Sequence, residues 1–228
     1  NHRNPLVTDG GDMQLKVMLF WLMFLPTDRC WTYSNQSHKR ASVCNFATFG
    51  YHFQLAVIYF FTAVLKSDPC WRSKGTALEW VLHVDQFTTG LGQWLLQFPE
   101  LLKLFTFAAL AIEFAIAPLL LWPVANRWTK TSAMFLIWAL HLGIAALLHL
   151  GVFVPITLVG ALGLMPSWLL DRLESLVKGS ADLNNEDAFS PAPKEPWHQK
   201  VIIVLTSIFV LTFNVHTLVD PKGSIPKP

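Results

Sequence analysis

Four long, uninterrupted runs of apolar residues constrain this chain more than any other feature. They extend over residues 46–65, 104–122, 131–150 and 201–219. Each approaches the roughly 20 residues that an α-helix needs to cross the hydrocarbon core of a bilayer. None contains Lys, Arg or Asp, and a single Glu lies in one of them. The chain is therefore predicted to be an integral membrane protein, with the lipid bilayer as its first partner.

Two shorter apolar runs, residues 13–25 and 152–165, cross the membrane at a tilt, re-enter it or lie deep in the bundle. With 53% hydrophobic and 14% charged residues, the chain is far from the soluble average of about 25% charged. Amphipathic stretches at residues 76–84 and 91–102 lie in the interface or fold back over the bundle. The fold is thus predicted as an all-α, polytopic membrane helix bundle with about five or six membrane segments and interfacial helices.

The distribution of charge predicts the orientation. The net charge of +2 is too small to suggest nucleic acid as a partner. If the runs cross in turn, the segments after residues 25, 122 and 165 share one side, which carries Arg29, Lys39, Arg40, Arg127 and Lys130. The positive-inside bias makes that side cytoplasmic, and a bacterial cytoplasmic membrane is expected. Residues 1–228 are then one membrane domain, in which residues 179–196 form a flexible cytoplasmic linker before the last helix.

The cysteines and the start of the chain add little. Cys30 and Cys44 would lie on the reducing side and Cys70 on the other, so no disulfide framework is implied. The chain starts at Asn1, without Met or a signal-peptide pattern, which suggests a truncated or processed product.

Lys66 and Glu113 are the polar residues most in need of explanation. Lys66 closes the first long run, where desolvation favours the neutral amine that a base needs. The alternative is that Lys66 reaches the headgroups with its ammonium group. Glu113 lies midway along the second long run, near mid-membrane depth, where a carboxylate is costly. It serves either a function or a structural hydrogen bond between helices.

His141 and His149 lie eight residues apart in the third long run. On one helix they would fall within about 80° of each other and form a polar strip with Glu113. Such a strip could relay protons. The alternative is that each His bonds a neighbouring backbone or hydroxyl group. A metal site built from these three residues is a weaker alternative, and no metal is predicted.

A family resemblance rests on several segments in a fixed order: His2–Asp12, Phe20–Pro26, Gln54 with Tyr59–Phe61 and Lys66, Trp71 with Gly75–Leu78, Glu113, and His141–Gly143. Together they look like the horizontally transferred transmembrane (HTTM) family, which is related to the membrane part of the vitamin K-dependent gamma-carboxylase. Residues 59–71 resemble the carboxylase segment that bears the catalytic lysine. Lys66 falls on that lysine, and His141 falls on a histidine in a later helix.

This resemblance implies a membrane enzyme, a carboxylase-like lyase or oxidoreductase that uses a lipophilic, vitamin K-like quinol or another lipid-soluble substrate. Lys66 would be the base, and Glu113 with His141 would position groups or relay protons. The rival hypothesis is a non-catalytic transmembrane subunit of a larger complex, whose partners are other membrane subunits. A transporter with a proton path through Glu113, His141 and His149 is less favoured, because no inverted repeat supports it.

Overall fold

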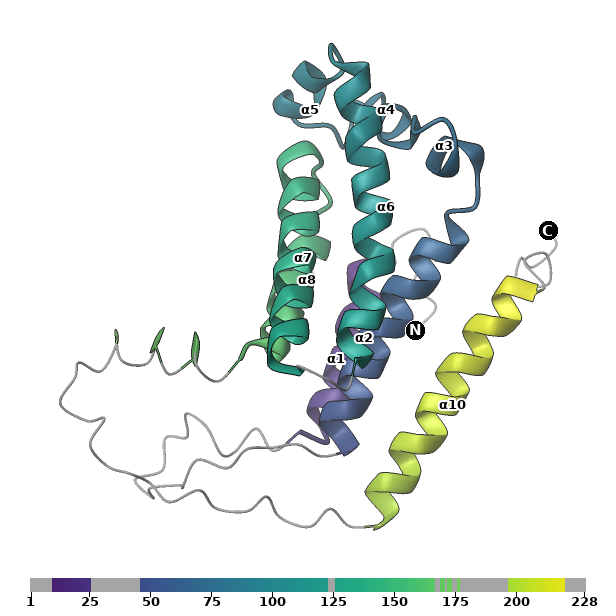
Figure 1. Cartoon of the computed structure of the whole chain (residues 1–228), viewed down its shortest axis with the longest axis vertical. Helices are drawn as coiled ribbons and strands as arrows, with labels where there is room; N and C mark the ends of the chain where they lie inside the picture. The colour runs from purple at the N-terminus through teal and green to yellow at the C-terminus, as the bar shows by residue number, and fades with distance from the viewer. Residues whose placement is uncertain are drawn as a thin grey trace. The chain divides into compact units, whose positions relative to one another are not determined.

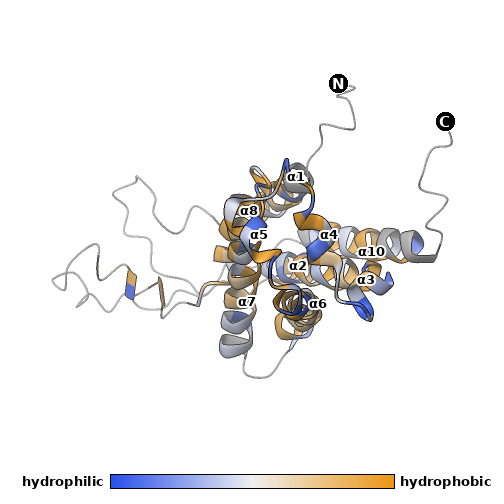
Figure 2. Cartoon of the chain, turned by 90° about the horizontal axis from the view of Figure 1, so that it is seen from above, coloured by the Kyte–Doolittle hydropathy of each residue, from blue (hydrophilic) through white to orange (hydrophobic). Residues whose placement is uncertain are grey.

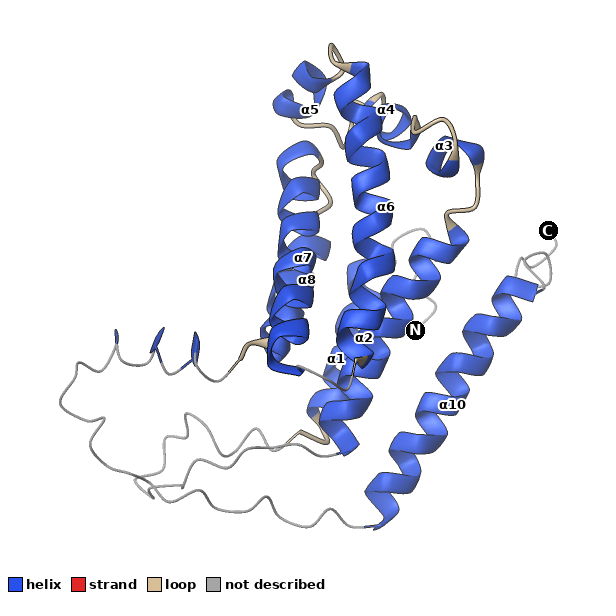
Figure 3. Ribbon diagram, in the orientation of Figure 1, coloured by secondary structure: helices blue, strands red, loops and turns tan. Residues whose placement is uncertain are grey.

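The computed structural model describes residues 10–25, 46–122, 126–166, 169–170, 172–173, 176 and 197–219. Within these residues the regular structure is helical, apart from one isolated antiparallel bridge between Thr88 and Leu148 (Figure 3). The predicted all-α class is therefore confirmed. The predicted linker at residues 179–196 lies outside the described residues, as do Cys30 and Cys44.

The helical elements follow the chain in the order that Figure 1 shows: α1 (Gly10–Leu22), α2 (Phe46–Leu65), α3 (Pro69–Arg72), α4 (Ala77–Leu82), α5 (Gly90–Leu95), α6 (Pro99–Leu121), α7 (Asn126–Leu147), α8 (Phe153–Ala161), the 3-10 helix η3 (Leu162–Leu164) and α10 (Trp197–Val219). By length and composition, α2, α6 and the part of α7 from Trp128 can cross a membrane. These are three of the expected five or six segments, counted over the described residues.

The remaining apolar helices are shorter. At 1.5 Å per residue, the 13 residues of α1 extend about 20 Å, less than the roughly 30 Å of a hydrocarbon core. Phe153–Leu164, which spans α8 and η3, is also short, and so is the apolar stretch Lys200–Thr212 of α10. How these segments meet the bilayer stays a prediction.

Two compact units make up the chain, and each is described by itself. The first contains the described parts of residues 1–16 and 55–164, and the second those of residues 17–54 and 165–228. The boundaries between the units fall inside α1 and α2.

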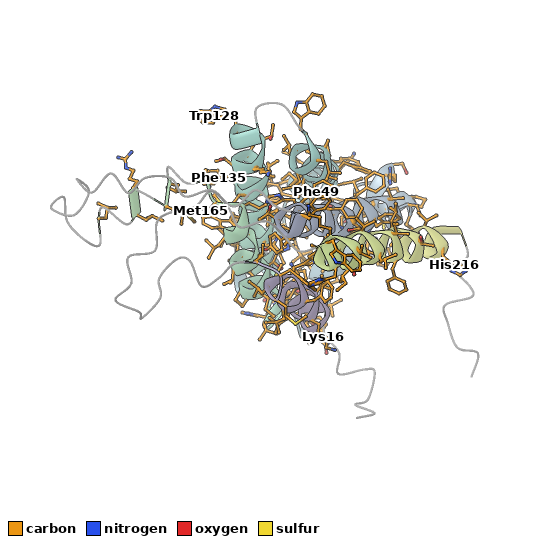
Figure 4. The ribbon with its side chains drawn as sticks, turned by 90° about the horizontal axis from the view of Figure 1, so that it is seen from below. Lys16, Phe49, Trp128, Phe135, Met165 and His216 are labelled. Atoms are coloured by element: carbon orange, nitrogen blue, oxygen red, sulfur yellow. The ribbon has the colours of Figure 1, made fainter. Side chains whose placement is uncertain are left out.

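In the first unit, α6 packs against α7, and α7 packs against α8. The buried residues of α6 recur every three or four positions: Leu102, Thr106, Leu110, Glu113, Ile116 and Leu120. This spacing puts them on one stripe of the helix. Hydrophobic residues prevail along α6 in Figure 2. On α7, Trp128 and Phe135, which Figure 4 labels, are 65% and 50% exposed. An apolar surface of this kind suits lipid better than water.

The short helices α4 and α5 pack over the ends of α6 and α7. Their buried residues join those of the long helices in one cluster of Leu82, Leu95, Leu102 and Leu148. The Thr88–Leu148 bridge ties the same loop to the end of α7, and the Thr89 hydroxyl donates to the carbonyl of Ala146 at 2.7 Å. Residues 77–82 of the first predicted stretch are thus helical, and the second stretch comprises most of α5, a turn and the start of α6. Whether these segments also lie in the membrane interface stays a prediction.

In the second unit, a close contact joins α1 to the first half of α2. Trp21 is 1% exposed, and a Cβ atom placed on Gly50 would lie 2.3 Å from Cζ3 of the Trp21 ring. Only a residue without a side chain lets the indole approach the backbone this closely. Gly50 therefore allows the two helices to pack.

Candidate functional site

Lys66 and Glu113, which sequence analysis singled out separately, meet in the first unit. The Lys66 ammonium donates a hydrogen bond to Oε1 of Glu113, across 47 residues of sequence. The side chains are 21% and 8% exposed, respectively. The pair is therefore partly buried, and its stability depends on good geometry because removing charges from water is costly.

Local structure explains why the two groups meet. Glu113 lies on the buried stripe of α6, so its side chain faces the packed interior of the unit. Lys66 directly follows the last residue of α2, where the backbone turns and Ser67 N–H donates to the Leu65 carbonyl at 2.8 Å. A cation is favoured at this end of a helix, since the last carbonyl groups point toward it.

The second carboxylate oxygen of Glu113 is the most informative atom of the site. Oε2 is buried and has no hydrogen-bond partner among the residues that the structure describes. Buried polar atoms are nearly always paired, and an exception needs an explanation. Oε2 of Glu113 can therefore accept a hydrogen bond from a further donor.

Two side chains of α3, Trp71 and Arg72, lie beside the ion pair and make cation–aromatic contacts there. The Lys66 Nζ lies over the Trp71 ring, 4.7 Å from its centroid. The Arg72 guanidinium lies 5.1 Å from the ring centroid of Phe114, the residue next to Glu113. Contacts between a cation and an aromatic face are attractive and gain strength where water is excluded.

Arg72 also reaches the end of α2. Its Nε donates to the carbonyl of Lys66 at 2.9 Å, and its Nη2 donates to the carbonyl of Ala63 at 3.1 Å. The last carbonyl groups of a helix have no partner within the helix, so the bond to Ala63 satisfies an acceptor that α2 leaves open, and the bond to Lys66 satisfies the carbonyl that follows the helix. Sequence analysis missed this role, although the Asp68-Pro69 pair is a recognisable helix start that turns the chain back.

Asp68 begins α3. Its carboxylate accepts a hydrogen bond from the backbone N–H of Cys70 at 2.8 Å, and Pro69 occupies the first turn. That hydrogen bond holds the pKa of Asp68 below its ordinary value. The pKa of the Cys70 thiol is raised, first through its hydrogen bond with Asp68. Both residues lie outside the membrane-spanning helices.

His141 is buried in α7 but does not join the ion pair. Its Nδ1 lies 2.9 Å from the carbonyl of Ile137 and donates to it. Its ring packs edge-on against Tyr59 at 6.1 Å and tilted against Phe153 at 5.5 Å, between centroids. No hydrogen bond to Lys66 or Glu113 is found within the described residues. The alternative that His141 bonds a neighbouring backbone group therefore holds for Nδ1. A role of His141 in proton transfer stays a prediction.

The predicted strip of His141 and His149 on one helix face is wrong. Helix α7 ends at Leu147, and the next residues pair with the loop before α5, where His149 N–H donates to the Phe87 carbonyl at 2.6 Å. His149 is exposed. Over the described part of the chain, no group of three or more His, Cys, Asp or Glu gathers as a metal site.

Comparison with known proteins gives one positive result. The model of the HTTM domain family matches residues 14–168, more than half of the chain, and this range contains Lys66, Glu113 and His141. No curated protein matches the chain, and no solved structure does. The matched range includes all three helices of spanning length and ends before α10. The chain is a membrane protein that belongs to the HTTM domain family, whose members are related to the gamma-carboxylase domain.

Proposed function

We propose that this protein is a membrane enzyme of carboxylase-like type that acts on a lipophilic quinol or another lipid-soluble substrate, with Lys66 as the base. One observation carries the proposal: the partly buried Lys66–Glu113 ion pair leaves the buried Oε2 of Glu113 without a partner among the described residues. An ionisable residue within an apolar membrane helix, such as Glu113, is costly to keep there, and this cost favours a functional role over a purely structural one.

The ion pair supplies a route to a neutral lysine. As a hydrogen-bonded ammonium, Lys66 has no lone pair and cannot accept a proton. Transfer of one proton from Nζ to Glu113 breaks an N–H bond, forms a carboxyl O–H bond and leaves both groups neutral. A water-poor setting favours two neutral groups over two separated charges. Lys66 can then take the proton of a substrate hydroxyl or other acid, and Glu113 holds the first proton.

The residues around the pair fit a hydroxylated aromatic substrate. Oε2 of Glu113 can accept a hydrogen bond from a hydroxyl group, and Trp71 and Phe114 bring aromatic faces near the pair. When bound, a quinol would supply an acidic hydroxyl and, after deprotonation, an electron-rich ring. His141 would act from α7, beside Tyr59, through the ring nitrogen that does not bond the Ile137 carbonyl.

The test is quinol-dependent turnover by Lys66→Ala in lipid nanodiscs. We expect a loss of about 10²-fold or more, the usual contribution of a general base. Lys74→Ala is the matched control, because it removes an exposed lysine from the same segment. Unchanged turnover by Lys66→Ala, or an equal loss in both variants, would reject the assignment of Lys66 as base.

The second candidate is a non-catalytic transmembrane subunit. The observation that favours it is the apolar surface of α10, where Leu205, Ile208 and Phe209 are 60%, 56% and 67% exposed. Partner helices could cover this surface, as could lipid. Stoichiometric co-purification with other membrane subunits, together with no turnover in the wild type, would support it. In either case we place the protein in a bacterial cytoplasmic membrane, with the cytoplasm on the side of Arg127 and Lys130.

A further inference from the structure

The residues after Lys66 form a compact turn that contacts Lys66 and Phe114, the residue beside Glu113. Helix α3 has four residues, too few to be stable by itself. It is held by the Asp68 cap at one end and by Arg72, whose guanidinium bonds back to α2, at the other. The turn therefore depends on these contacts for its stability. Arg72 and Trp71 both contact Lys66.

Arg72 contacts the backbone of Lys66 on one side and the Phe114 ring of α6 on the other. Through Nε it bonds the carbonyl of Lys66, and through Nη2 it bonds the carbonyl of Ala63, one turn earlier. Its guanidinium plane faces Phe114, the immediate neighbour of Glu113 on α6. One side chain thus fixes the backbone of the lysine and contacts the residue beside the acid.

We infer that Arg72 is a positioning residue that holds Lys66 in contact with Glu113. Without it the last turn of α2 loses the donors for its carbonyl groups, and the Lys66 side chain leaves the carboxylate for the membrane surface. Arginine suits this task because its planar fork presents several donors at fixed angles, whereas a lysine presents one point charge. The inference deepens the proposed function and rests on it for its catalytic meaning, but the contact itself can be tested without turnover.

The experiment measures how fast an N-hydroxysuccinimide ester labels the Lys66 amine at one fixed pH. The full chain is held in lipid nanodiscs, and labelling at Lys66 is followed by mass spectrometry. In the wild type, the ion pair and the Trp71 ring protect the amine, so labelling is slow. In Arg72→Met we expect it to rise on the order of tenfold, the change that corresponds to losing hydrogen bonds made by a charged group.

Two further variants separate positioning from charge and from general loosening. Arg72→Lys keeps the charge but loses the fork, and we expect it to label Lys66 nearly as fast as Arg72→Met. Lys74→Met removes an exposed charge from the same segment, and we expect wild-type labelling. If Arg72→Met is poorly folded, Arg72→Lys carries the test.

A double variant tests whether Arg72 acts through the Lys66–Glu113 pair. Glu113→Gln alone should raise Lys66 labelling, because it removes the ionic partner. If Arg72 acts through that pair, adding Arg72→Met to Glu113→Gln changes labelling by less than twofold, since coupled residues are not additive. The inference would be overturned if Arg72→Met raised the labelling rate by the same factor in the Glu113→Gln background as in the wild type. Wild-type labelling in both Arg72 variants would overturn it as well. Because no substrate is used, fast labelling in Arg72→Met together with full turnover in Lys66→Ala would reject the proposed function and keep the positioning role.

Discussion

Two polar side-chain contacts join helices in the first unit, and they differ in charge and in whether they leave a buried atom unpaired. The Thr157 hydroxyl of α8 lies 2.9 Å from Oε1 of Gln14 in α1 and 2.9 Å from the carbonyl of Phe153. Lys66 and Glu113 join α2 to α6. The first contact is neutral, and neither of its side chains has an orphaned buried atom within the described residues, whereas Glu113 leaves Oε2 unpaired.

The difference bears on which of the two contacts stability alone can explain. Neutral hydrogen bonds between membrane helices contribute modestly to stability, on average about 0.6 kcal/mol in double-mutant cycles. A buried ion pair costs much more to desolvate and often stabilises a protein no better than apolar residues would. The charged contact therefore has a poor structural justification, and its unpaired oxygen points to a ligand.

Removing one partner of the charged contact should give the largest loss of stability. Lys66→Met leaves the Glu113 carboxylate buried alone, and we expect the unfolding free energy to fall by about 3 kcal/mol, the lower end for a broken buried pair. The measurement is unfolding in mixed micelles with increasing dodecyl sulfate. The double variant Lys66→Met/Glu113→Leu should recover most of the loss. A neutral effect of the single variant would mean that the pair is not buried as described.

The neutral contact should respond more weakly. Thr157→Val removes the hydroxyl that faces Gln14, and we expect a loss of about 0.6–2 kcal/mol in the same unfolding measurement. Quinol-dependent turnover should stay within twofold of the wild type, because this contact lies outside the Lys66 site. A large loss of turnover without a loss of stability would remove the distinction between the two contacts.

The smallest effect is expected at Asp68, on the edge of the charged site. Its pKa lies below the ordinary value in the folded protein because the Cys70 N–H donates to the carboxylate. The cap therefore stabilises α3 above the ordinary aspartate pKa, and this contribution is lost as the pH falls through the lowered pKa. Hydrogen exchange of the α3 amides should show reduced protection in that acidic range. Asp68→Ala should lack the pH dependence, and Asp85→Ala should keep it.

Much of the fold could be predicted from apolar runs alone. The run over residues 46–65 coincides with α2, and no Asp, Glu, Lys or Arg interrupts it. The next run was predicted to start at Leu104, but α6 begins at Pro99. A proline in the first turn, followed by Glu100, starts the helix before its apolar part begins. At the other end, α7 stops at Leu147 because the Thr88–Leu148 bridge takes the backbone out of the helix.

The individual residues Lys66 and Glu113 could be predicted from the sequence, but the contact between them could not. Lys66 and Glu113 are anomalous in their apolar runs, and that signal is local. Their contact spans 47 positions and depends on how α2 and α6 pack, which no local pattern contains. Arg72 was missed for the same reason: in sequence it is one more loop charge, and its bonds to Ala63 and Lys66 appear only after the chain turns back.

Turnover by Lys66→Arg, compared with Lys66→Ala, tests the central claim most directly. Arginine keeps a positive charge beside Glu113 but stays protonated under all ordinary conditions, so it cannot serve as a base. If Lys66 is the base, Lys66→Arg is as inactive as Lys66→Ala, although it is more stable. If Lys66→Arg keeps turnover within a few-fold of the wild type, the lysine supplies charge alone and its assignment as the base is wrong.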